Sequence, residues 1–128
     1  MADVNRGNRP LSPHLSVYRM SQINTVTSIL NRITGAGLLV AFGLLAWWFV
    51  AAATGQGAFD PINGLLSSFL GKLILLGSLW ALWFHFLGGI KHLIMDTGRG
   101  FDLKTSDRIS WGVLIGSVLL TLLSICWL

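Results

Sequence analysis

Two histidines within a long apolar stretch are the residues of this sequence best suited to holding a cofactor. His85 lies about ten residues from the nearest polar loop, a depth of roughly 15 Å for a helix that rises about 1.5 Å per residue. An imidazole at that depth in a membrane needs a partner, and ligation of a haem iron would provide one. A hydrogen bond to a neighbouring helix, worth only about 1 kcal/mol in membranes, is the alternative. The position of His85 alone leaves both interpretations open.

The pattern around His85 favours a flat cofactor. His92 follows two helical turns later on the same face, with Gly88 and Gly89 between them. Small residues allow either a planar group or a second helix to approach the backbone, and their combination with two histidines favours the planar group. Because the two histidines share one helix face, they cannot ligate one iron from opposite sides of a ring. The other apolar stretches contain no histidine, so we expect a partner chain to supply the second ligand.

Ser28 and Arg32 form a second pair of interest, one helical turn apart near the start of the first apolar stretch. Arg32 stays charged and could donate hydrogen bonds to a quinone carbonyl or a haem propionate, with Ser28 as a second donor to the quinone. The alternatives are an arginine that extends to the membrane surface and a serine bonded to its own backbone. Asp96, eleven residues after His85, either contacts a docked soluble subunit, pairs with Arg99 or is a solvated helix end.

Three apolar segments must position these side chains. They cover residues 29–53, 65–95 and 109–128. The chain is 53% hydrophobic and only 11% charged, whereas soluble domains carry about 25% charged residues. About 20 apolar residues are enough to cross a bilayer as a helix. We therefore expect an all-α membrane protein with three transmembrane helices in one domain, residues 1–128.

The segments outside these spans predict the topology. A polar arm occupies residues 1–20, a turn residues 54–63 and a polar loop residues 96–110, and Ser21 is the expected N-cap of the first helix. Basic residues are concentrated in the arm and the second loop, which predicts a cytoplasmic N-terminus and a C-terminus on the opposite side. The arm lacks the apolar run of a secretory signal, which favours an uncleaved span in a bacterial inner membrane. The basic residues form no patch for nucleic acid.

Three motifs, in order and spacing, resemble those of the cytochrome b (cytochrome b556) membrane-anchor subunits of succinate dehydrogenase. The motifs are RPLSPHLSVY over residues 9–18, SILNRITG over residues 28–35 and HFLGGIKHLIMD over residues 85–96. The resemblance covers nearly the whole chain. Three motifs in register are more specific than any one of them alone.

The resemblance implies a subunit of the complex that oxidises succinate at a flavoprotein, passes electrons through an iron–sulfur subunit and reduces ubiquinone. It implies a b-type haem shared with a second anchor subunit, with His85 as one axial ligand of the haem iron and a histidine of that subunit as the other. His92 and Arg32 would lie near the haem propionates, Ser28 and Arg32 at the quinone, and Asp96 at the iron–sulfur subunit. The alternatives are a haem-free structural anchor and the anchor of a fumarate reductase.

Two positions depart from the family pattern. Asn31 stands where the family commonly has histidine, and Lys91 stands where it commonly has arginine. Lysine keeps the positive charge but not the bidentate geometry of arginine. We expect these departures to alter contacts with a propionate or a quinone, and to leave the His85 ligand and the Ser28–Arg32 pair in place.

Overall fold

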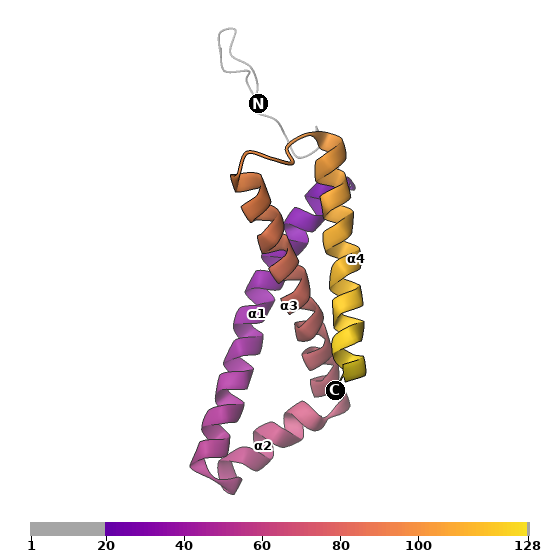
Figure 1. Ribbon diagram of the computed structural model, residues 1–128. Helices are drawn as coiled ribbons and strands as arrows, with labels where there is room; N and C mark the ends of the chain where they lie inside the picture. Colours follow the sequence, from indigo (N-terminus) through magenta and orange to yellow (C-terminus); the bar gives the residue numbers. More distant parts are fainter. Residues whose placement is uncertain (1–19, 128) are drawn as a thin grey trace, which may run out of the picture.

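The computed structural model describes residues 20–127, which form four helices (Figure 1). The helices are α1 (Ile23–Thr54), α2 (Gln56–Ser67), α3 (Phe69–Asp96) and α4 (Leu103–Trp127). Three of them, α1, α3 and α4, are long and apolar enough to cross a membrane. The predicted all-α fold with three membrane-spanning helices is therefore confirmed.

Helix α1 begins one residue later than its expected cap indicated. Its N-cap is Gln22, not Ser21, and the Gln22 side chain makes no capping hydrogen bond. The helix ends at Gly55, which adopts φ 129° and donates its N–H to the Ala51 carbonyl oxygen at 3.2 Å. A positive φ is accessible to glycine at little cost, so Gly55 lets the chain turn sharply into α2.

The turn predicted over residues 54–63 is wrong, because most of that segment belongs to α2. Ile62 is fully buried, and it packs with Leu66 and Ala51 against the half-buried Trp48. This apolar burial outweighs the helix-breaking tendency of Pro61, which lies inside the helix. Sequence reasoning weighed the glycines and the proline of the segment and missed its buried face.

The span predicted over residues 65–95 is two helices, separated at Ser68. The Ser68 hydroxyl accepts a hydrogen bond from the Gly71 N–H at 3.1 Å and so caps the start of α3. A Cβ atom at Gly71 would collide with the carbonyl oxygens of Leu65 and Leu66. Glycine at this position allows the last turn of α2 to lie directly against the first turn of α3.

The loop predicted over residues 96–110 is shorter, because α4 begins at Leu103. The Asp102 carboxylate accepts the Thr105 N–H at 3.0 Å, and Gly98 and Gly100 take positive φ values in the turn before it. Hydrogen bonds from Thr105 hold the pKa of Asp102 below its usual range. Since the folded-state pKa is depressed, the cap stabilises α4 at neutral pH, and this contribution is lost as acid protonates the carboxylate.

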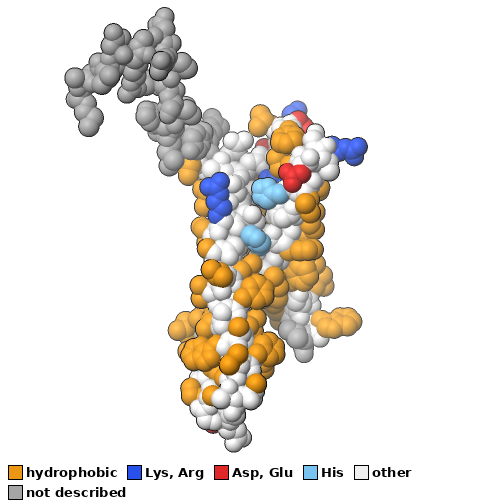
Figure 2. All heavy atoms as spheres, turned by 90° about the vertical axis from the view of Figure 1, so that its left-hand side faces the viewer, with side chains coloured by type: hydrophobic (Ala, Val, Ile, Leu, Met, Phe, Trp, Pro, Cys, Tyr) orange, Lys and Arg blue, Asp and Glu red, His pale blue; other side chains and the backbone are white. Residues whose placement is uncertain are grey.

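Small and polar side chains, together with the fully buried Phe84 of α3, lie between the long helices. The buried residues of α4 are Ser106, Ser110, Val113, Ser117 and Thr121. Large apolar side chains face outward, as Leu39 (77% exposed) and Trp127 (92% exposed) do. Figure 2 shows such side chains covering the lower part of one face. This arrangement suits a bilayer, where close helix packing needs small interfacial residues and lipid surrounds the apolar ones.

The long helices place the predicted site residues at one end of the molecule. The start of α1 and the loop between α3 and α4 lie together there, and α2 crosses the opposite end (Figure 1). Helix α3 packs against both α1 and α4. The side of the membrane to which each end belongs remains the prediction made from the basic residues.

Candidate haem and quinone site

The ring of His85 is seated against α1 by a backbone hydrogen bond. His85 Nδ1 lies 3.0 Å from the Asn31 carbonyl oxygen. A carbonyl oxygen can only accept, so Nδ1 carries the proton, and Nε2 of the neutral ring keeps its lone pair. The hydrogen bond that the sequence offered as an alternative to ligation is therefore present. It also orients the ring and leaves Nε2 as the nitrogen available to a metal.

Close approach of α1 and α3 makes this seat possible. A Cβ atom at Gly35 would lie 2.9 Å from His85 Cε1, which is closer than carbon atoms tolerate. A Cβ atom at Gly88 would collide with the Asn31 side-chain oxygen. Glycine on each helix therefore admits a side chain of the other, as small residues do at membrane helix interfaces.

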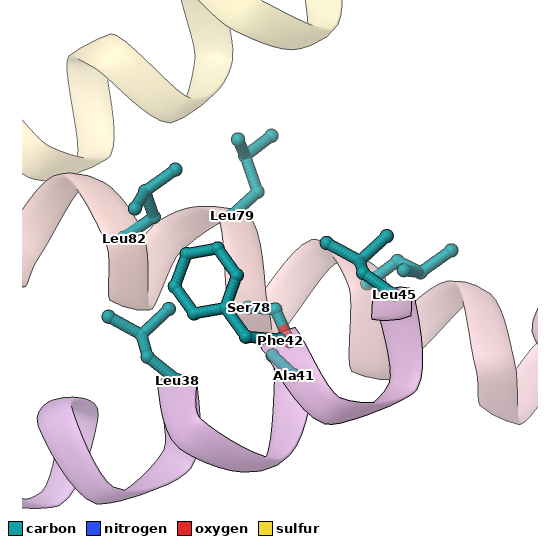
Figure 3. A pocket seen from close by; sticks show the side chains of 8 residues that line it. Leu38, Ala41, Phe42, Leu45, Ser78, Leu79 and Leu82 are labelled. Atoms are coloured by element: carbon teal, nitrogen blue, oxygen red, sulfur yellow. The ribbon is translucent and has the colours of Figure 1, made fainter. Parts of the chain in front are cut away.

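An apolar groove lies on the same face of α3 as His85 and begins one helical turn before it. Leu82 and Ser78 lie one and two turns before His85, and with Leu38 and Phe42 of α1 they border a cavity of about 190 Å³ (Figure 3). Helices α1 and α3 separate toward α2 (Figure 1). One ligating nitrogen beside an apolar wall fits one side of a haem.

Within residues 20–127, His85 is the histidine placed for such an iron. Among residues 20–127, no three or more His, Cys, Asp or Glu side chains come together as a protein-only metal site. The fit of these residues to a haem iron therefore rests on His85.

The structure brings Ser28 and His92 to one small cavity. This cavity of about 30 Å³ is bordered by Ser28 and Thr27 of α1 and by Lys91 and His92 of α3. Ser28 and His92 are exposed on its outer side. Figure 2 shows the described histidine side chains on one face of the upper half of the molecule, where basic side chains also lie. Ser28 and His92, which are 64 positions apart and belong to two different motifs, therefore share one surface.

Arg32 and Asp96 lie outside that cavity. Arg32 is exposed on α1, one turn after Ser28, so its guanidinium can extend to a bound group without first breaking a buried contact. Asp96 is the exposed last residue of α3 and makes no ion pair with Arg99 in the part of the chain that the structure describes. The solvated helix end and the contact with another subunit remain the two interpretations of Asp96.

Sequence reasoning missed a polar network that joins α1, α3 and α4 at the same end. Asn24 is its centre: its Oδ1 accepts from Lys91 Nζ at 3.1 Å, Ser106 Oγ at 2.9 Å and Ser110 Oγ at 2.6 Å. Asn24 Nδ2 donates to Asp107 Oδ1 at 2.5 Å, and Lys91 Nζ also donates to Ser110 Oγ at 2.6 Å. The serines one turn apart on α4 were the available signal, since hydroxyls on one face of a span need partners.

The network explains how Lys91 is held near the membrane. A charged side chain in a span is costly unless it is paired or hydrogen-bonded. Lys91 finds an amide and a hydroxyl oxygen on the two neighbouring helices. The departure from arginine at this position therefore contributes to helix packing in this chain.

Comparison with known proteins supports a single family. Residues 5–124 match the model of the succinate dehydrogenase/fumarate reductase transmembrane subunit family. The succinate dehydrogenase cytochrome b556 subunit of Paracoccus denitrificans is 49% identical over 125 residues, covering 98% of this chain and 95% of the relative. The subunit of the same name from Rickettsia felis is 37% identical and covers 90% and 89%. The mitochondrial succinate dehydrogenase cytochrome B subunit of Schizosaccharomyces pombe is 36% identical and covers 89% and 66%.

Proposed function

Because this chain belongs to the family of succinate dehydrogenase and fumarate reductase transmembrane subunits, we propose that it shares a b-type haem with a second anchor subunit and helps to form the site of ubiquinone reduction. As a cytochrome b anchor of succinate dehydrogenase it contributes to catalysis only within the complex. The observation that carries the haem proposal is the His85 ring, whose Nδ1 is held by the Asn31 carbonyl and whose Nε2 is left for iron.

In this proposal His85 would ligate the haem iron, and a histidine of the second anchor subunit would be the second ligand. The haem supplies a one-electron redox centre next to the quinone. The apolar groove that begins at Leu82 and Leu38 receives the ring. His92 and Arg32, at the polar end of the same region, neutralise the propionates.

Ser28 and Arg32 bind the quinone. Arg32 stays charged in any setting, so it stabilises the negative charge that develops on a quinone oxygen as electrons arrive. The stabilisation is greater in a site of low dielectric than in water. Ser28 lies one turn away and donates a second hydrogen bond. Both residues are exposed on α1, where a quinone can reach them.

The partners follow from this placement. Arg99, Lys104 and Arg108 lie at the same end as the quinone residues, which supports a cytoplasmic location for this end of a bacterial inner-membrane protein. The iron–sulfur subunit docks there, with Asp96 in its interface, and delivers electrons that the flavoprotein subunit takes from succinate. The named relatives are succinate dehydrogenase subunits, which favours succinate oxidation over the reverse reaction of a fumarate reductase.

Purification of the assembled complex in detergent tests this proposal. Succinate should reduce added ubiquinone, and a reduced-minus-oxidised visible spectrum should show a low-spin b-type band in proportion to this chain. A complex that reduces ubiquinone without any haem band would make the chain a haem-free anchor. A complex that shows the haem band but reduces only artificial dyes would contradict the proposed quinone site.

A further inference from the structure

One buried oxygen of this site lacks a partner. Among residues 20–127, Asn31 Oδ1 is the one buried side-chain nitrogen or oxygen that makes no hydrogen bond. The oxygen lies over Gly88, where no side chain is present to reach it. Buried acceptors are almost always satisfied by protein or by ordered water. The hydrogen-bond partner of Asn31 Oδ1 must therefore occupy the space beside it.

The cavity beside Asn31 has the size and the polarity of a water site. Its volume of about 30 Å³ exceeds the roughly 10–15 Å³ that one water molecule requires. Polar groups of Thr27, Ser28, Lys91 and His92 border it. A buried water typically makes about three hydrogen bonds, and these residues provide that number of partners.

The hydrogen bonds of Lys91 leave a donor for this water. Its ammonium group has three N–H donors, and two of them go to Asn24 Oδ1 and Ser110 Oγ. The third is available on the side of Lys91 that borders the cavity. A water there accepts from Lys91 Nζ, donates to Asn31 Oδ1 and has a second O–H for Ser28 or His92.

We propose that this cavity holds one water molecule, positioned by Asn31 Oδ1 and Lys91 Nζ, which delivers protons to the quinone beside Ser28. The proposal rests on the quinone site proposed above. Reduction of a quinone to a quinol takes up two electrons and two protons. The electrons come from succinate through the other subunits. The water passes a proton through the Ser28 hydroxyl to a quinone oxygen and regains one from the aqueous side, so it is not consumed.

The surrounding groups suit such a path. Lys91 is half-buried, and its hydrogen-bonded network continues to Asp107 near the polar start of α4. The titratable groups around the cavity and the network are Lys91 and His92 of α3 and Asp107 of α4, whereas α1 contributes neutral side chains. With the proposed water in place, a proton would have a polar route from the loop end of the molecule to Ser28.

Replacement of Asn31 by leucine tests the proposal in the assembled complex. Leucine removes the oxygen and fills the site with apolar carbon, so quinone reduction should fall by on the order of 10²-fold, the size of a lost proton-transfer contribution. The solvent deuterium isotope effect on quinone reduction should rise. Dye reduction at the flavoprotein should stay normal. The haem band is recorded for each variant, and the rates of quinone reduction are compared per haem-loaded complex. Asn63→Leu is the matched control, because Asn63 lies on α2 and contacts Trp48.

A second pair of variants keeps the test decisive if Asn31→Leu does not assemble. Lys91→Met removes the donor to the water and should slow quinone reduction, whereas Lys91→Arg keeps a donor and should retain most of the rate. A map of the complex that resolves waters should show density between Asn31 and Lys91. Wild-type rates and isotope effects in Asn31→Leu or Lys91→Met would overturn the water path. Absence of quinone reduction in the wild type would instead remove the quinone site itself.

Discussion

The Arg32→Met variant should reduce ubiquinone about 10²- to 10³-fold more slowly than the wild type, the usual loss when a donor to a developing oxyanion is removed. Methionine keeps much of the length and apolar surface of the side chain, so α1 should stay intact. Arg32 is exposed on α1 and makes no contact that folding requires, so the loss should fall on catalysis rather than on stability. The measurement is succinate-driven ubiquinone reduction by the purified complex.

Two controls separate the quinone site from the rest of the complex. Succinate-driven reduction of a soluble dye depends on the flavoprotein and should be unchanged in Arg32→Met. Arg99→Met removes another exposed arginine at the same end and should keep the wild-type rate of ubiquinone reduction. Arg32→Lys should be intermediate, because lysine keeps the charge without the planar fork. Equal ubiquinone reduction by Arg32→Met and wild type would remove Arg32 from the quinone site.

Substitution of Gly35 by valine should abolish or shift the haem band. The first carbon of any side chain at this position would lie 2.9 Å from His85 Cε1, so the imidazole must move or α1 and α3 must separate. Either change breaks the hydrogen bond between His85 Nδ1 and the Asn31 carbonyl that orients Nε2. The haem content per complex, measured from the difference spectrum, should fall to a small fraction of the wild-type value.

The neighbouring glycines provide the matched control for this substitution. Gly37 and Gly43 lie on α1 with nothing within 4 Å of the position of a Cβ atom. Valine at either one changes the same helix by the same atoms and should leave the haem content normal. A normal band in Gly35→Val, or an equal loss in all three variants, would show that the close contact with His85 does not seat the haem.

Periodicity and composition were sufficient to predict three spans and to place Ser28 and His92 at one end. The first connection was wrong because Gly55, Gly57 and Pro61 indicate a turn one residue at a time. The helix is instead stabilised by Ile62, whose burial against α1 is a tertiary effect. Local sequence patterns do not show which side chains a distant segment will bury.

The contacts that make the site specific could not be predicted for a related reason. The hydrogen bond from His85 to Asn31 spans 54 positions, and that from Lys91 to Asn24 spans 67. Both depend on where α1 and α3 cross, and hence on how closely Gly35 and Gly88 allow them to approach. Gly88 of the haem motif was recognised in the sequence as a point of close approach. Its contact with the Asn31 side chain became known only from the packing.

The central claim, that His85 holds the haem iron, is tested most directly by the reduced-minus-oxidised spectrum of the complex with His85→Ala, compared with His92→Ala. His85 is proposed to present Nε2 to the iron, one helical turn from the apolar groove, whereas His92 is proposed to contact only a propionate. The account predicts that His85→Ala loses the low-spin b-type band and that His92→Ala keeps it. An unchanged band in His85→Ala, or its loss only in His92→Ala, would contradict the assignment.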